Sequence, residues 1–205
     1  MHKEILTKNQ LELLSLIKLF SKDFILVGGT AIALYLGHRR SIDFDLFSSK
    51  PLKRRVIKKI IEEKKYSTKD ILYEAYDQMH LVVNSVKMTF FQFPHSIAAT
   101  QKFGTIISIP SLLDLAAMKA YALGGRAKWK DYVDLYFIMK DHHRYKEIAH
   151  RAKILFKTFF NEKLFREQLC YFKDIDYTES IEFYKNDVPQ KEIKELLTTI
   201  SISPF

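Results

Sequence analysis

The sequence predicts an α/β protein in which strands and helices alternate over the first half of the chain and helices dominate the second half. The alternation of polar and apolar residues that is typical of strands occurs before residue 110, and apolar residues at helical spacing dominate from Ser111 onward. The chain contains no repeat, low-complexity tract or Gly/Ser-rich linker. We therefore expect an α/β lobe over residues 1–110 and a helical lobe over residues 111–205, which could still form one cooperative unit.

The N-terminal region predicts an amphipathic helix over residues 2–21. Its apolar residues recur at helical spacing, and Glu12 and Lys18 interrupt the apolar run. A membrane-spanning helix needs about 20 apolar residues, and no segment of the chain reaches that length. The single cysteine, Cys170, supports neither a disulfide nor a zinc site, and its apolar neighbours predict a core position. We therefore expect no membrane partner and a cytoplasmic location.

The remaining segments of the first half are short. In order they are a strand at 23–27, a turn at Gly28-Gly29, a helix at 30–36, a strand at 41–47, a helix at 51–65 opened by Pro51, and strands at 70–76, 79–84, 86–93 and 106–109. The second half predicts helices at 111–123, 130–140, 145–160 and 161–172, with weaker helices to about 197. Within the third of these, Phe156, Phe159 and Phe160 recur at helical spacing and are expected in the core.

The net charge of +9 is unevenly distributed, because basic residues crowd the helix predicted at 51–65. A basic protein gains attraction and faster encounter with a polyphosphate or a nucleic acid. The same residues could instead be the solvated side of a helix whose Ile57 and Ile61 pack inward. Both interpretations can hold for one helix.

Gly28-Gly29-Thr30 joins a predicted strand to a predicted helix. Two glycines allow a tight turn and a close approach to a ligand, and the helix that follows directs free N–H groups and its positive dipole end outward. The segment could therefore bind phosphate, although a plain strand-to-helix turn has the same pattern.

Asp43 and Asp45 lie two residues apart in the strand predicted at 41–47, so they share one face while Phe44 points into the core. Two such carboxylates repel each other unless a cation lies between them, and their hard oxygens suit Mg²⁺. The pair could also be merely solvated. Together with the glycine turn, however, it predicts attack of an acceptor oxygen on the α-phosphorus of a nucleotide, with pyrophosphate leaving.

Three charged residues of the second half are further candidates. Lys119 lies beside an apolar helical stripe, where a lysine usually extends to solvent. Asp131 and Asp134 share a helical face, and they could simply complement the dipole of a helix that begins near Lys130.

In the first half of the chain, His38-Arg39-Arg40 could bind phosphate or nucleic acid, or form a solvated turn.

Two separate blocks of this sequence resemble a known family. Gly28-Gly29-Thr30, followed after twelve residues by Asp43-Phe44-Asp45, resembles the DNA-polymerase-β-type nucleotidyltransferase superfamily, and residues 28–47 resemble its AbiEii/AbiGii toxin branch. The second block covers residues 114–120 and 130–136, with Arg126 between them. The resemblance covers residues 20–140.

The resemblance implies a nucleotidyltransferase fold, in which a mixed sheet flanked by helices precedes a helical lobe that completes the active site. It implies a metal-dependent toxin of a toxin–antitoxin system, a family in which some members add nucleotides to tRNA ends and others only bind nucleotides. The expected cofactor is Mg²⁺, and the expected partners are a nucleoside triphosphate, RNA (a tRNA end) and a cognate antitoxin protein. The residue roles implied are phosphate binding by Gly28, Gly29, Thr30 and Lys119, metal binding by Asp43 and Asp45, and completion of the site by Asp131, with Asp134 the less certain acid.

One position departs from the superfamily. Many members carry a third carboxylate on a central strand, where this sequence has Thr89 after Val86-Lys87-Met88. A hydroxyl is a weak proton acceptor and a poor Mg²⁺ ligand, so the family pattern leaves Asp131 as the candidate base. Besides transfer to RNA, the sequence therefore leaves open transfer to a small-molecule hydroxyl, or a catalytically weak module that binds a nucleotide or a partner.

Overall fold

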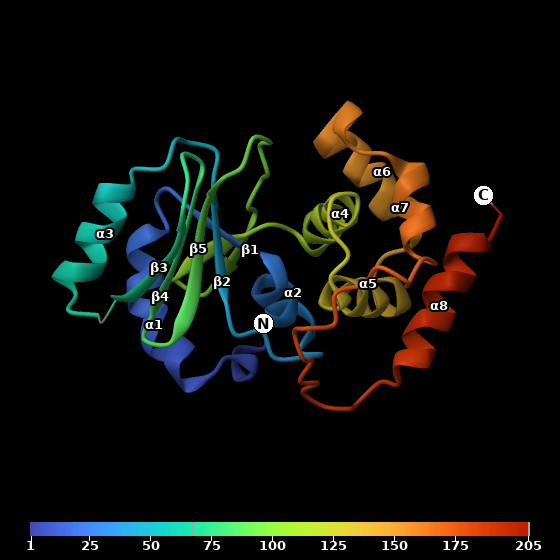
Figure 1. The fold of residues 1–205 in the computed structure, drawn as a ribbon, viewed down its shortest axis with the longest axis horizontal. Helices are drawn as coiled ribbons and strands as arrows, with labels where there is room; N and C mark the ends of the chain where they lie inside the picture. Colours follow the sequence, from blue (N-terminus) through green and yellow to red (C-terminus); the bar gives the residue numbers. More distant parts are fainter. Residues whose placement is uncertain (67, 205) are drawn as a thin grey trace. The chain divides into compact units, whose positions relative to one another are not determined.

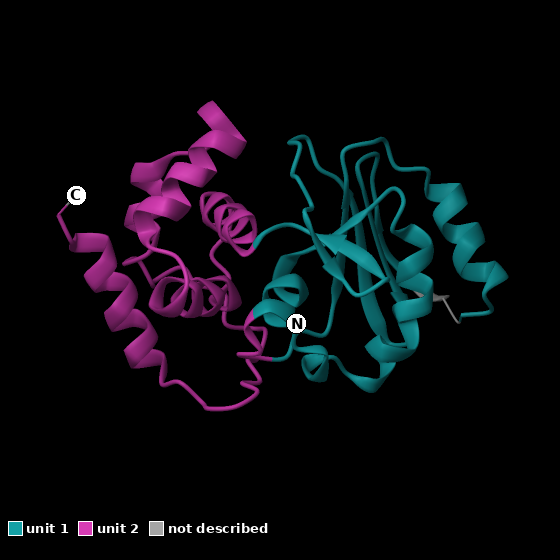
Figure 2. Ribbon diagram, turned by 180° about the vertical axis from the view of Figure 1, so that it is seen from behind, with its two compact units in different colours: residues 1–35, 40–111 teal, residues 36–39, 112–205 magenta. Residues whose placement is uncertain are grey.

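The computed structural model describes residues 1–66 and 68–204, so Ser67 and Phe205 lie outside the described residues. The chain divides into two compact units, coloured separately in Figure 2. Unit 1 comprises residues 1–35 and 40–111, and unit 2 comprises residues 36–39 and 112–205. The short piece 36–39 is assigned to the second unit although its neighbours on both sides belong to the first.

Unit 1 is built on a five-stranded mixed sheet of order β1-β2-β5-β4-β3 (Figure 1). Its strands are β1 (Ile25–Val27), β2 (Phe44–Ser48), β3 (Thr68–Glu74), β4 (Gln78–Val83) and β5 (Val86–Gln92). The β2–β5 pair is parallel and the other pairs are antiparallel. A two-stranded hairpin follows, with β6 (Gln101–Phe103) and β7 (Ile107–Ile109). The predicted α/β class with a mixed sheet is confirmed.

The helices of unit 1 are α1 (Lys8–Phe20), α2 (Gly28–Leu36) and α3 (Arg54–Glu63), with a short 3-10 turn at Lys3–Ile5. A capping box between Thr7 and Gln10 begins α1, since each residue satisfies a backbone N–H of the other. The ring of Phe20 packs edge-on against Phe90 of β5, with centroids 4.9 Å apart. One face of the sheet is therefore buried beneath α1, while side chains of the other face are half-buried.

The helices of unit 2 are α4 (Leu112–Leu123), α5 (Trp129–Asp141), α6 (Tyr145–Phe156), a 3-10 turn at Lys157–Phe159, α7 (Glu162–Gln168) and α8 (Gln190–Ile202). The predicted helix 145–160 breaks early because Lys157 adopts a left-handed φ of 50°. Helical spacing therefore no longer applies beyond Phe156, and Phe159 is 71% exposed. Its predicted core position was wrong, as was that of Cys170, which is exposed.

Two further expectations differ from the structure. The helix predicted at 51–65 begins at Arg54, so Pro51 precedes it instead of occupying its first turn. Gly28 and Gly29 lie in the first turn of α2 and not in a separate turn. Among the described residues, no helix combines the length and apolarity that a membrane crossing requires.

Candidate active site

The glycine segment and the acid pair meet at one end of the β1–β2 ladder. Val27 lies opposite Asp45 across the two strands, so Gly28 follows directly after the position that faces the acid. Gly28 has a φ of +72°, and a Cβ placed on it would lie 2.1 Å from Oδ2 of Asp45. Only glycine permits this approach. The two motifs that the sequence presents separately therefore form one site.

Thr30 is buried, with 1% of its surface exposed. Its hydroxyl donates to the backbone oxygen of Asp43 and to Oγ of Ser41, the latter at 3.0 Å. In this structure the side chain holds the segment just before the acid pair. Direct contact between this hydroxyl and a phosphate would require the bond to Asp43 to be exchanged, whereas the N–H groups of the first turn of α2 remain suited to an anion.

Asp43 and Asp45 are both half-buried, and Phe44 between them is fully buried, as predicted. Among the described residues, no group of three or more histidines, cysteines or acids is arranged to hold a metal ion. A pair of carboxylates is nonetheless what Mg²⁺ commonly takes from a protein, because substrate phosphates and water supply the remaining oxygens. The residues present therefore fit this ion.

Thr89 of β5 lies directly beside Asp45 of β2 in the parallel pairing of these strands. Both residues belong to the half-buried face of the sheet. His80 of β4 lies opposite Thr89 and continues the same row. The position next to the acid pair on the central strand is thus a hydroxyl, and no carboxylate replaces it there.

Lys119 of α4 does not extend to solvent, so that expectation was wrong. It is 5% exposed, and its Nζ contacts Asp131 and, at 2.9 Å, Oδ2 of Asp134. Both acids lie on α5 and are fully buried. Burial alone would lower the pKa of Lys119, but the two carboxylates raise it.

His38 and Arg39 belong to the same buried cluster in unit 2. Arg39 binds Asp134 through two hydrogen bonds of 2.7 and 2.9 Å, and Nε2 of His38 lies 2.9 Å from the same carboxylate. The two residues are 6% and 3% exposed. The solvated-turn interpretation of this segment does not hold for them, because both side chains are buried and paired with Asp134.

The charges of this cluster hold both acids in the ionised form. Burial opposes ionisation of Asp134, but Arg39 and Lys119 hold its pKa well below the usual value. Burial likewise opposes ionisation of Asp131, but Lys119 and Arg126 lower its pKa. A carboxylate in this state is a weak proton acceptor. Asp131 therefore fits a positioning role for Lys119 better than the role of a general base.

The pKa of His38 is lowered, chiefly by burial, so its imidazole is neutral at neutral pH. A neutral ring that donates from Nε2 to Asp134 leaves Nδ1 as an acceptor. Within the described part of the chain, Nδ1 has no hydrogen-bond partner. The pairing of His38 and Arg39 with Asp134 was not predicted from the sequence. The available signal was that Asp131 and Asp134 lie on an otherwise apolar helix face, where buried acids need cations as partners.

Comparison with known proteins identifies the family. The family described as "Nucleotidyl transferase AbiEii toxin, Type IV TA system" matches residues 13–201. The chain belongs to this AbiEii family. It is therefore a nucleotidyltransferase of the toxin–antitoxin type, and the resemblance seen in the sequence is confirmed.

An AbiEii-family assignment also agrees with the relatives found. An uncharacterised protein of Aquifex aeolicus (strain VF5) is 31% identical over 186 residues, which cover 85% of this chain and 88% of that protein. Two solved structures share the fold. A candidate nucleotidyltransferase from Helicobacter pylori has a TM-score of 0.62 at 15% identity, with 94% of this chain and 91% of the other covered. MenT4, a nucleotidyltransferase toxin of Mycobacterium tuberculosis, has a TM-score of 0.60 at 11% identity, with 96% and 84% covered.

Proposed function

We propose that this AbiEii-family protein transfers a nucleotide from a nucleoside triphosphate to an RNA acceptor, at a tRNA end, with Mg²⁺ held by Asp43 and Asp45. The observation that carries the proposal is the contact between Gly28 and Asp45, where a Cβ would lie 2.1 Å from the carboxylate. It brings the turn suited to phosphate and the acids suited to metal to one place, and nucleotidyl transfer needs both together.

In unit 1, different residues would bind the phosphates, hold the metal ion and position the acids. N–H groups of Gly29 and Thr30 at the start of α2 would bind the triphosphate, aided by the helix dipole. Mg²⁺, when held by Asp43 and Asp45, would neutralise the charge that develops on the phosphates and on the leaving pyrophosphate. The hydroxyl of Thr30 fixes the Asp43 backbone and so keeps the first acid in position.

In unit 2, Lys119 is proposed as a further phosphate ligand. Its ammonium has three N–H groups, of which Asp131 and Asp134 take two. The third could donate to a phosphate, and the two acids would fix its direction. Asp131 thereby acts through Lys119 as a positioning residue.

An RNA acceptor is supported by the charge on α3. Ile57 and Ile61 of this helix are buried and hold it to unit 1. The opposite side and the flanking residues expose cations that attract a polyanion. These exposed residues are Lys53, Arg55, Lys59, Lys64 and Lys65. Since tRNA and nucleotides are cytoplasmic, we place the reaction there, under the control of a cognate antitoxin.

The experiment is to incubate the full chain with Mg²⁺, α-phosphate-labelled nucleoside triphosphates and total RNA. Label on tRNA, absent with the Asp43→Asn, Asp45→Asn double variant, is the expected result. Label on an added aminoglycoside alone would move the assignment to a small-molecule acceptor. Nucleotide binding without label on any acceptor would leave a binding module and overturn the proposal.

A further inference from the structure

A recess in unit 1 opens away from Asp45. Ile25 and Phe47 pair at one end of the β1–β2 ladder, whereas Val27 and Asp45 pair at the other. A cavity of about 320 Å³ opens at the Ile25–Phe47 end. Ser48, which lines it, is three residues beyond Asp45, or roughly 10 Å along the strand. The recess therefore opens at the end of the β1–β2 ladder opposite to Asp45.

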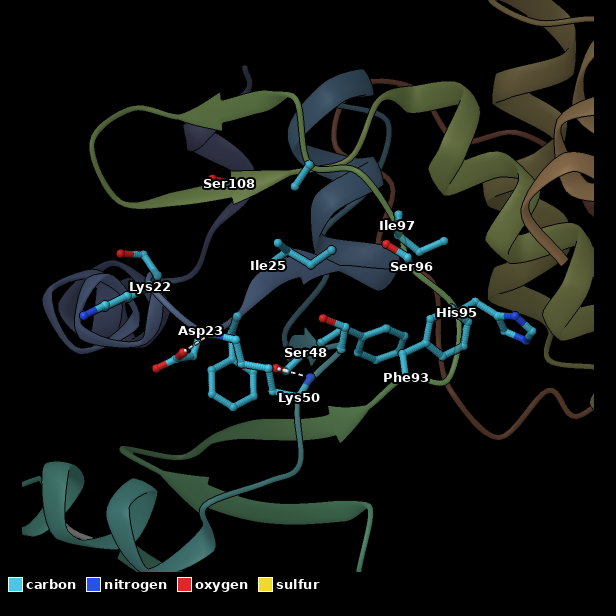
Figure 3. Close-up of a pocket in the computed structure, with 15 residues that line it drawn as sticks. Lys22, Asp23, Ile25, Ser48, Lys50, Phe93, His95, Ser96, Ile97 and Ser108 are labelled. Carbon is cyan, nitrogen blue, oxygen red and sulfur yellow. Dashed lines mark hydrogen bonds and ion pairs between the residues drawn. The ribbon is translucent and has the colours of Figure 1, made fainter.

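The recess is formed where several chain segments converge: the end of α1, the start of β1, the residues after β2, the residues after β5, and β7. Figure 3 shows Lys22 and the Asp23–Lys50 pair on one side, with Phe93 and Ser96 on the other. The lining thus combines cations and hydroxyls with an aromatic ring.

Positive charge exceeds negative charge around the recess. Among the described residues, two lysines and one acid, Asp23, line the recess, and two further lysines lie next to it. Two of the lysines line the recess itself, a third lines an adjoining recess that shares Asp23, and the fourth donates to Oγ of Ser108 at 2.7 Å. They are Lys22, Lys50, Lys53 and Lys102.

Asp23 does not cancel this field. Nζ of Lys50 lies 3.0 Å from its carboxylate, and their side chains are 69% and 56% exposed. The hydrogen bond from Lys50 is the main reason why the pKa of Asp23 is lowered, and the charges of Lys53 and Lys22 lower it further. An exposed pair of this kind is weak, so a phosphate can compete for Lys50.

The other side of the recess offers a surface for a planar ring. The rings of Phe47 and Phe93 lie 5.1 Å apart, and both line the cavity. Nucleic-acid bases stack on such aromatic faces without regard to sequence. The hydroxyls of Ser49 and Ser96 line the same space and can donate to phosphate oxygens.

We propose that this recess is a second nucleotide-binding site, with the phosphate at Lys50 and the base against Phe93. Its volume falls at the lower end of the range for small-molecule sites, roughly 300–1,000 Å³, which suits a single nucleotide. That nucleotide can come from an RNA chain or from the free pool, since both present the same phosphate and base. The proposal does not depend on the transfer reaction.

The test is a nuclear magnetic resonance titration of the ¹⁵N-labelled full chain in Mg²⁺-free buffer, with AMP and separately with a short oligoadenylate RNA. Amide shifts are expected at Ser49 and Ser96. Reversing two charges with Lys22→Glu and Lys50→Glu should weaken binding by about tenfold or more, because the contact of Lys50 with the phosphate is lost and the positive charge around it is reversed. The matched control makes the same change at Lys163 and Lys191, whose side chains are 86% and 85% exposed.

The outcomes show whether the nucleotide comes from an RNA chain or from the free pool, and whether the site exists. Shifts with RNA alone identify an RNA chain as the ligand, and shifts with AMP as well identify the free nucleotide; both support the site. Equal losses in the two double variants, or shifts confined to Gly28 and Thr30, would overturn it. Failure to label tRNA would refute the proposed function and leave this binding result untouched.

Discussion

Replacing Lys119 by methionine should destabilise the protein strongly. The ammonium is 5% exposed and lies between Asp131 and Asp134, so its removal leaves two buried carboxylates with fewer partners. Breaking a buried ion pair costs about 3–5 kcal/mol. Arg39 and Arg126 continue to pair with the acids, which favours the lower end. At about 2–4 °C per kcal/mol for a chain of this size, the melting temperature should fall by roughly 6–12 °C.

Thermal unfolding followed by circular dichroism measures this directly. Lys163→Met is the matched control, because that side chain is 86% exposed and its pair with Glu167 should contribute little. Adding Asp131→Asn to Lys119→Met removes one of the stranded charges, so the double variant should lose less stability than the sum of the two single variants. A drop below about 2 °C for Lys119→Met, or an equal drop in the control, would refute the buried ion-pair network.

Three further predictions concern Gly28, Thr89 and His38. Gly28→Ala should abolish transfer by displacing the Asp45 carboxylate, whereas Gly104→Ala, which has a positive φ of +55° but nothing within 4 Å, should retain activity in the same labelling assay. Thr89→Asp should raise Mg²⁺ affinity in calorimetry, because it places a third carboxylate beside Asp45; Thr89→Val should not. The pKa of His38 is lower in the folded state than its ordinary value of 6.5. The stability gained by burying the neutral ring is therefore complete above pH 6.5, and it is lost as the pH falls below that value. Melting temperatures measured between about pH 7 and about pH 5.5 should therefore fall less steeply in His38→Gln.

Much of the fold could be predicted because local patterns coincide with tertiary burial. The polar–apolar alternation around Phe44 and Asp45 matches the burial of β2, and the isoleucines at helical spacing in α3 are buried. The failures lie where a backbone conformation cannot be read from residue type. Lys157 adopts a left-handed φ, which ends α6 and exposes Phe159. The spacing of apolar residues does not predict such a break in the helix.

The candidate site was predicted in part for the same reason. Gly28, Asp43 and Asp45 lie within twenty residues of sequence, so strand and turn geometry alone indicated their proximity. The burial of Lys119 could not be predicted from the chain near it. Its partners come from α5, and the cation that completes the pairing of Asp134 is Arg39, which is 95 residues away in sequence. Contacts of that separation leave no local periodicity.

The two acid pairs of this chain show how surroundings decide what a carboxylate can do. Asp131 and Asp134 are fully buried and already compensated by Lys119 and Arg39, so a metal ion could bind them only by breaking ion pairs. Asp45 is half-buried, and among the described residues it forms no ion pair. Its carboxylate lies against Gly28, where any side chain would collide with it. Similar sequence spacing therefore yields a structural pair in unit 2 and, in unit 1, a pair whose second acid, Asp45, has not been taken up by an ion pair among the described residues.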